Sequence, residues 1–265
     1  MHCPHIIIFH NNTIQNRNGH YIGWIANKLN CPVNTLRISS CRFINLTNSL
    51  NSNQITNCGG CGLWIVIDKN AKYTITFDDC YFENNKAPKG NGGAIDYGSG
   101  TETLKSNELI FLNCLFVRNT ATSNGGALSI GTLYQSTIKN CTFIENVAAS
   151  NGGAIYIFPN PYDHRSDAST ISNCTFRGNS ASTNGNAIHF DARASDTSYH
   201  YVEYCTFENN CKESSAETDG ILTLSDTKVS FSNLDFLFDE SAKNLQPFVF
   251  LNKPFTASSV VFENI

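Results

Sequence analysis

The sequence is poor in charge, in methionine and in long apolar runs. Charged residues make up 15% of the 265 positions, the formal net charge is −4, and methionine occurs once. Lysine and arginine form no cluster, which argues against a nucleic-acid partner, since proteins that bind nucleic acids carry a basic patch or stripe. No apolar run is long enough to cross a membrane as a helix, and the run at residues 6–9 is too short for the core of a signal peptide.

Asparagine, glycine and phenylalanine are abundant instead. The chain contains 34 asparagines, 18 glycines and 18 phenylalanines. Asparagine forms helices poorly and is common in turns and in left-handed backbone positions. Eleven cysteines would suggest a disulfide scaffold in a short secreted protein, but here they are spread over a long chain and most recur at one place in a repeat. We therefore expect a chain that turns often and contains little helix.

A two-part motif recurs in a fixed order. Its first half reads Asn-Cys-x-Phe-x-x-Asn, and its second half, Asn-Gly-Gly-Ala-Ile, follows after four or five residues in the best copies. The four clear copies, with a fifth that decays, occupy residues 79–85 and 91–95, 113–119 and 124–128, 140–146 and 151–155, 173–179 and 184–188, and 204–210 and 219–222. Chance does not produce four such copies, so the motif indicates a repeat protein.

Weaker copies extend the repeat toward both ends. The phenylalanines of the first half-motif lie at 43, 82, 116, 143, 176, 207, 236 and 262, with separations between 26 and 39 residues. A glycine box with cysteines on both sides, at residues 58–61, precedes the first clear copy. A period that varies this much is typical of a solenoid whose turns carry loops of different length.

The residue types favour a β-helix over other solenoids. Leucine-rich repeats need leucines that this chain lacks, and helical repeats need helix formers. Short pieces rich in β-branched and aromatic residues, separated by turn residues, are typical of strands. Cys141 and Phe143 are two residues apart, so both side chains should point inward. Stacking at about 4.8 Å then predicts a phenylalanine column and an asparagine hydrogen-bond ladder, and the paired glycines fit a bend with positive φ or close backbone approach.

These features predict an all-β chain that forms a right-handed parallel β-helix of about eight coils. Residues 1–40 are expected to form an irregular coil or a partial cap, and residues 41–265 to hold the repeats, with both parts continuous in one domain.

The alternating Gly-Gly-Ala-[Ile/Leu] and Phe-x-x-Asn boxes resemble the repeats of chlamydial polymorphic outer membrane proteins and related protist surface proteins, over about residues 41–224. The resemblance implies a pectin-lyase-like β-helix at a cell surface or outside the cell, often acting as an adhesin. No export signal and no C-terminal membrane segment of the bacterial kind is recognised in this sequence. We therefore expect an internal fragment, or a truncated product, of a longer surface protein that self-associates end to end.

The recurring cysteines are candidates for chemistry, but packing explains them better. Metal binding would require cysteines close together in sequence or paired with histidine. Disulfides between neighbouring coils are disfavoured, because in-register strands hold Cβ atoms about 5 Å apart and a disulfide prefers about 3.8 Å. The Cys-Gly-Gly-Cys segment at 58–61 has the spacing of a redox or half-zinc motif, but it lacks a second pair and a βα context. The six cysteines interpreted as small buried apolar residues are Cys41, Cys80, Cys114, Cys141, Cys174 and Cys205.

The acidic residues match no known enzyme pattern on this fold in full. Polygalacturonase-like enzymes share an acidic pair, a Gly-His-Gly and an Arg-x-Lys, of which only the pair Asp78-Asp79 occurs, and Asp79 occupies a turn position where other repeats have asparagine. The richest polar stretch is residues 162–167, with His189, Asp191 and Arg193 one repeat later. We interpret these as loop and outer-face residues, with a ligand site as the alternative.

No residue is therefore assigned a catalytic, cofactor-binding or metal-binding role. Four Asn-x-Ser/Thr sequons occur, at Asn11, Asn45, Asn140 and Asn173, and two of them arise from the repeat motif itself. The leading hypothesis is a non-enzymatic surface or secreted rod that binds a cell-surface protein or glycan through its outer faces and through loops at 98–108, 158–170 and 191–203. The alternative is a carbohydrate-active enzyme, a polysaccharide lyase or glycoside hydrolase, on the same fold.

Overall fold

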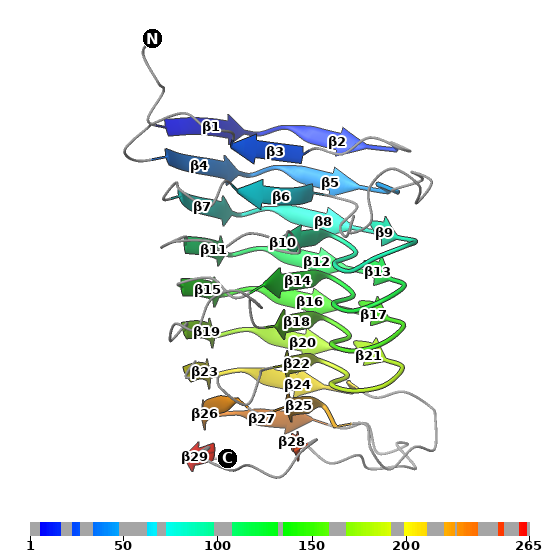
Figure 1. Cartoon of the computed structure of the whole chain (residues 1–265), viewed down its shortest axis with the longest axis vertical. Coiled ribbons are helices and arrows are strands. Elements are labelled where there is room, and N and C mark those ends of the chain that lie inside the picture. The colour runs from blue at the N-terminus through cyan, green and yellow to red at the C-terminus, as the bar shows by residue number, and fades with distance from the viewer. Residues whose placement is uncertain are drawn as a thin grey trace.

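The computed structural model describes residues 6–16, 23–26, 34–47, 63–67, 73–97, 108–131, 135–158, 168–191, 199–210, 220–225, 227–237, 249–251 and 260–263. These residues form 29 short strands and no helix. The strands stack along one axis into a rod (Figure 1), and each pairs in parallel with the equivalent strands of the coils before and after it. The expectation of an all-β, parallel β-helix of about eight coils is confirmed. No helix long and apolar enough to span a membrane occurs in the described part of the chain.

Four sheets run the length of the rod or part of it. Sheet A contains β1 (Ile6–His10), β4 (Asn34–Ser39), β7 (Tyr73–Asp78), β11 (Glu108–Leu112), β15 (Gln135–Lys139), β19 (Ala168–Ser172), β23 (Tyr199–Glu203), β26 (Lys228–Ser232) and β29 (Val260–Glu263). Sheet B contains β2 (Thr13–Gln15), β5 (Arg42–Ile44), β8 (Tyr81–Glu83), β12 (Leu115–Val117), β16 (Thr142–Ile144), β20 (Thr175–Arg177), β24 (Thr206–Glu208) and β27 (Asp235–Leu237).

The second half of each coil forms the other two sheets. Sheet C is short and contains β9 (Lys86–Ala87), β13 (Thr120–Ala121), β17 (Val147–Ala148) and β21 (Ser180–Ala181). Sheet D contains β3 (Gly23–Ala26), β6 (Leu63–Ile67), β10 (Ile95–Tyr97), β14 (Leu128–Gly131), β18 (Ile155–Phe158), β22 (Ile188–Asp191), β25 (Leu222–Ser225) and β28 (Val249–Leu251).

The repeat motif sets the register, so like residues stack on like. Phe116 of β12 pairs with Phe82 of β8 on one side and with Phe143 of β16 on the other. Their rings are 4.8 Å apart, centroid to centroid, and nearly parallel in both pairs. The column continues through Phe176 and Phe207, as the motif predicts.

The turns explain the many asparagines. One turn precedes each of the six recurring cysteines, which we call the ladder cysteines. The residue at this turn has positive φ in every described coil, for example Asn113 (55°) and Asn140 (56°). A second turn follows each strand of sheet B from β2 to β24, and it too has a positive-φ residue, such as Asn84 (52°). Asparagine tolerates this left-handed region better than most residues. Asp79 has a φ of 54°, which confirms its interpretation as a turn residue.

The two glycines of each box have different roles. The first, Gly125 in one copy, has a φ of 67°. The second, Gly126, lies so close to the next coil that an added Cβ would be 2.0 Å from the carbonyl oxygen of Gly153. Both expected reasons for a glycine pair are confirmed, each at a different residue.

The structure differs from the predicted boundaries at two kinds of place. Strands β1, β2 and β3 already belong to sheets A, B and D, so a regular coil begins within the segment expected to be irregular. The predicted boundary lies at Cys41, the first cysteine of the motif. Each such cysteine follows a strand of sheet A, so a boundary at the cysteine leaves out the strands that come before it. The predicted loops 158–170 and 191–203 are too long, because β19 and β23 occupy their final residues. The outward side chains of these two strands are polar, so the sequence there indicated a loop instead of a strand.

Candidate functional site

The outer face of sheet D carries a column of polar side chains. In each coil the residue after the Ile or Leu of the glycine box faces away from the core, since its neighbours on the strand point inward. These residues pair in register from strand to strand and are Asp96, Ser129, Tyr156, His189 and Thr223. We call them the sheet D column.

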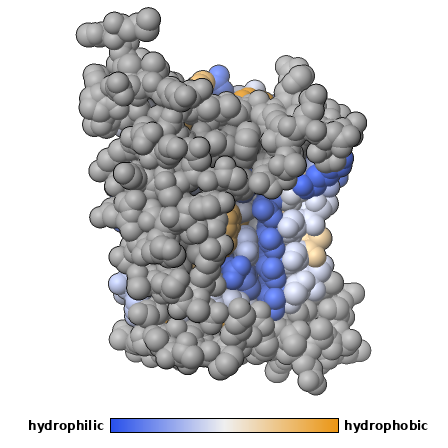
Figure 2. Space-filling view, viewed as in Figure 1, coloured by the Kyte–Doolittle hydropathy of each residue, from blue (hydrophilic) through white to orange (hydrophobic). Residues whose placement is uncertain are grey.

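The sheet D column is buried although it lies on the outside of the sheet. Asp96, Ser129 and Thr223 are fully buried, and His189 is 3% exposed. The outer face of sheet D is therefore covered, as is usual for a parallel sheet. Beside it, on the side where sheet C lies in Figure 1, the space-filling view shows a column of hydrophilic side chains along the long axis (Figure 2).

Two aromatic residues form the centre of the sheet D column, and a carboxylate beside them contacts one of the two rings. The Tyr156 ring stacks on the His189 ring at a centroid distance of 5.6 Å. The Tyr156 hydroxyl donates a hydrogen bond of 2.9 Å to Asp191 of β22. Burial, with the Asp191 charge second, raises the pKa of Tyr156 above its usual value. Tyr156 is therefore a neutral phenol that donates its proton in a hydrogen bond to the Asp191 carboxylate.

His189 is held neutral by its surroundings. Burial lowers the pKa of His189 to about 4. Among the described residues, its Nδ1 atom has no hydrogen-bond partner, and neither has Oγ of Ser129 or Oγ1 of Thr223. At neutral pH this histidine is an uncharged aromatic side chain between Tyr156 and Thr223 rather than a cation.

The carboxylates of this face are poorly placed for glycoside hydrolysis. Asp96 and Asp191 belong to β10 and β22, which are separated by two intervening strands. Three strand spacings amount to about 14 Å, whereas the paired carboxylates of glycoside hydrolases are about 5–10 Å apart. Among the described residues, no group of three or more His, Cys, Asp or Glu side chains could hold a metal ion.

Most of the polar stretch weighed in the sequence lies outside the described residues. Residues 162–167 and Arg193 are among these, as is the Cys-Gly-Gly-Cys segment at 58–61. His189 and Asp191 are described, and both lie on the outer side of β22, as expected. The loop interpretation does not hold for them, since they belong to a strand.

Asp78 and Asp79 lie on the surface of the rod. Asp78 forms an ion pair of 2.8 Å with Arg37 and accepts a hydrogen bond from Nδ2 of Asn113. Asp79 accepts a hydrogen bond from the hydroxyl of Ser40. These contacts join neighbouring coils, so the pair has a structural role in this chain.

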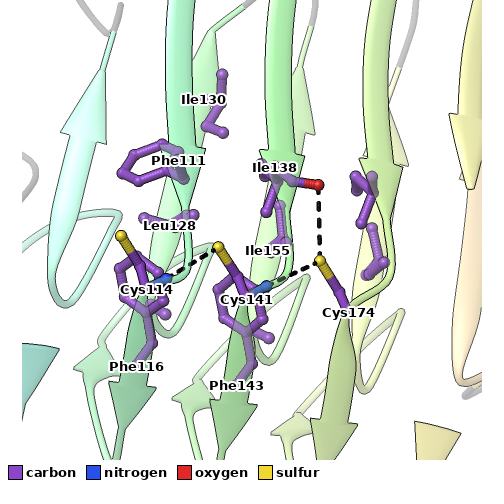
Figure 3. Close-up of a cluster of buried hydrophobic side chains, with 14 of the residues drawn as sticks. Phe111, Cys114, Phe116, Leu128, Ile130, Ile138, Cys141, Phe143, Ile155 and Cys174 are labelled. Carbon is purple, nitrogen blue, oxygen red and sulfur yellow. Dashed lines mark hydrogen bonds between the residues drawn. The ribbon is translucent and has the colours of Figure 1, made fainter. Parts of the chain in front are cut away.

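The ladder cysteines are free thiols packed in the core (Figure 3). The Sγ atom of Cys141 accepts a hydrogen bond of 3.4 Å from the backbone N–H of Cys114, and Cys174 accepts one from Cys141. Burial raises the pKa of the Cys174 thiol well above its usual range. All six cysteines are buried in the core, which confirms their interpretation as packing residues.

The motif predicts inward residues but misses the sheet D column. The one available signal was position: the residue after the conserved Ile or Leu must face outward in a strand. Its identity changes in every copy, so it does not appear in a consensus.

Comparison with known proteins identifies the repeat. A family model, the Chlamydia polymorphic membrane protein repeat, matches residues 79–96, 113–131, 140–157 and 173–191. Each match begins at the turn before a ladder cysteine and ends in or beside a strand of sheet D. No curated protein and no solved structure matches the chain. Four segments of this β-helix, one in each of four successive coils, thus match the repeat of Chlamydia polymorphic membrane proteins.

Proposed function

We propose that this chain is a non-enzymatic rod, displayed at a cell surface or secreted, that acts as an adhesin. It binds a protein or glycan of a host or neighbouring cell through its outer faces and through the segments between sheets D and A. The matched repeat supports the surface location, because its description refers to membrane proteins.

One observation carries the proposal: the interior is nearly constant from coil to coil while the exterior varies. The inward residue of each strand in sheet B is phenylalanine in the six coils from β5 to β24. The preceding outward residue of those strands is, in order, Arg42, Tyr81, Leu115, Thr142, Thr175 and Thr206. A scaffold of this kind holds variable surface residues in fixed positions, which suits recognition.

The segments between sheets D and A vary as well. In four successive coils they contain 10, 3, 9 and 7 residues, between strands whose register does not change. Length variation of this kind leaves the stacked core intact and changes the surface beside it.

Binding to intact cells tests the proposal. The fluorescently labelled chain should bind saturably to cultured animal cells, and an excess of unlabelled chain should compete. Antibodies against the chain should label intact, unpermeabilised cells of its source. Binding that neither saturates nor competes, with no surface labelling, would contradict the proposal.

The enzyme alternative is tested with the same preparation. The chain is incubated with neutral and acidic polysaccharides, and new reducing ends and unsaturated products are measured. Turnover that exceeds a heat-denatured control would replace the adhesin proposal with a carbohydrate-active enzyme.

A further inference from the structure

One coil carries three tyrosines on its outer surface. Tyr199 and Tyr201 point outward from β23, while the residues between and after them, His200 and Val202, are buried. Tyr204 follows at the turn, with a φ of 54°. Tyr201 is 38% exposed and Tyr204 is 58% exposed; among the described side chains, Phe9 is the only other aromatic residue as open to solvent.

The rings of Tyr199 and Tyr201 lie side by side. The ring centroids of Tyr199 and Tyr201 are 5.0 Å apart, and the two ring planes make an angle of 49°. Tyrosine offers a large, stiff apolar face at a small entropic penalty, and its hydroxyl remains available to water or to a ligand. An exposed set of such rings is a candidate contact surface.

Short uncharged residues flank Tyr201 and Tyr204 in the adjacent coils. Tyr201 pairs in register with Thr170 of β19 and with Ser230 of β26. The turn position of Tyr204 holds asparagine in the coil before and in the coil after, at Asn173 and Asn233. These hydroxyls and amides can both donate and accept hydrogen bonds.

The chemistry of this surface favours a sugar over a protein. A pyranose ring has one apolar face of C–H groups, which packs on an aromatic ring, and hydroxyls at its rim, which suit serine, threonine and asparagine. A standard protein interface buries about 800 Å² on each partner around an apolar centre, whereas these tyrosines have polar neighbours. β23 carries one carboxylate, Glu203, and the register partner of Tyr199 in β26 is Lys228, so the two strands contribute one residue of each charge here and offer an acidic sugar no net attraction.

We propose that Tyr199, Tyr201 and Tyr204 form a binding platform for a neutral pyranose glycan. The proposal rests on the proposed function and names the class of partner that the rod binds.

The repeat itself supplies a variant that should fold. Tyr201→Thr combined with Tyr204→Asn places at both positions the residues that the preceding coil already has, Thr170 and Asn173. The full chain is applied to immobilised neutral, sialylated and sulfated oligosaccharides. We expect binding to neutral members, weakened at least about tenfold by this double variant, because aromatic anchors contribute most of the energy at such sites.

Two controls test whether the aromatic rings of Tyr201 and Tyr204 are what binds the glycan. The combination of Tyr201→Phe and Tyr204→Phe keeps both rings and should change affinity less than about threefold. Val147→Thr removes an exposed apolar side chain from sheet C, where the register partner in the preceding coil is Thr120, and should leave affinity unchanged. All variants are compared by circular dichroism and thermal unfolding.

Several outcomes would overturn the platform. Equal glycan binding by the folded Thr/Asn variant would place the site elsewhere, and binding to sialylated or sulfated members alone would contradict the charge argument. Cell binding without glycan binding would overturn the platform and leave the adhesin proposal intact. A chain that binds neither cells nor glycans would overturn both the platform and the adhesin proposal.

Discussion

At the scale of the residue, each inward phenylalanine lies between two others of its kind. Phe143 is fully buried, and its ring centroid is 4.8 Å from that of Phe116 and 4.9 Å from that of Phe176. The energy of such a residue comes from close packing on both of its faces. Thr142, the adjacent residue on the same strand, faces outward and is half-buried.

Truncation of Phe143 should therefore be severe. Phe143→Ala is expected to lower the free energy of unfolding by about 3–5 kcal/mol, because it opens a cavity in the column. Thr142→Ala should lower it by less than about 1 kcal/mol. Urea denaturation measures both values, and similar losses would contradict the assignment of inward and outward positions.

The buried histidine should make stability depend on pH. Burial lowers the pKa of His189 from 6.5 to about 4, so between these values the unfolded chain binds a proton that the folded chain does not. Stability is then highest above pH 6.5 and falls as the pH is lowered toward 4, by about 3 kcal/mol from this group.

A variant isolates this contribution. His189→Thr copies the residue that Thr223 supplies at the same place in the next coil. Urea denaturation between pH 7 and 4 should show a smaller loss of stability for the variant than for the wild type. Parallel pH profiles would mean that His189 is not held neutral.

At the scale of the element, the asparagine ladder joins successive coils through the core. Nδ2 of Asn146 donates to the Phe116 carbonyl of the coil before and to Oδ1 of Asn179 in the coil after. Its Oδ1 accepts from the backbone N–H and the Nδ2 of Asn119. The ladder residues are fully buried and are Asn85, Asn119, Asn146, Asn179 and Asn210.

Breaking this ladder in the middle should weaken the whole rod. Asn146→Ala leaves several buried groups without a partner, each at about 1–3 kcal/mol, and we expect a total loss of about 3–5 kcal/mol. Asn140→Gly is the control: Asn140 is exposed, has positive φ, and donates to Asn113 on the surface. It should change stability by less than about 1 kcal/mol, and equal thermal shifts for the two variants would argue against the ladder as a source of stability.

The sequence predicted the inward residues of each coil, which contact their equivalents in the coils on either side. Cys141, Phe143 and Asn146 each contact copies of themselves in adjacent coils, so the same choice was repeated and the motif could be recognised. The two-residue strands of sheet C were not predicted, because such short segments show no alternation. The sheet D column was missed for another reason: Tyr156 and His189 face away from the stack, and the residue type at their position changes from coil to coil.

At the scale of the whole molecule, the coils are interchangeable units. Removal of residues 140–172 joins Lys139 of β15 to Asn173 at the equivalent turn of the next coil. Phe116 would then stack on Phe176, and Asn119 would pair with Asn179, in the contacts that each now makes with the missing coil.

The shortened chain should therefore fold. We expect an unchanged β-sheet signal per residue by circular dichroism and cooperative thermal unfolding, since each coil depends mainly on its neighbours. Removal of residues 140–155, which is about half a coil, joins a strand of sheet A to one of sheet D and should abolish cooperative unfolding. A folded half-coil deletion, or an unfolded full-coil deletion, would contradict this modular description.

The direction of the hydrogen bonds between coils also has a mechanical consequence. They run along the rod, so tension between its two ends pulls each coil directly away from the next instead of sliding one strand past another. Successive phenylalanine anchors are 26–39 residues apart, and a released coil of this size would lengthen the chain by roughly 90–130 Å. A rod anchored at one end and attached at the other would thus extend in steps under load, one coil at a time, and act as a shock absorber between two surfaces.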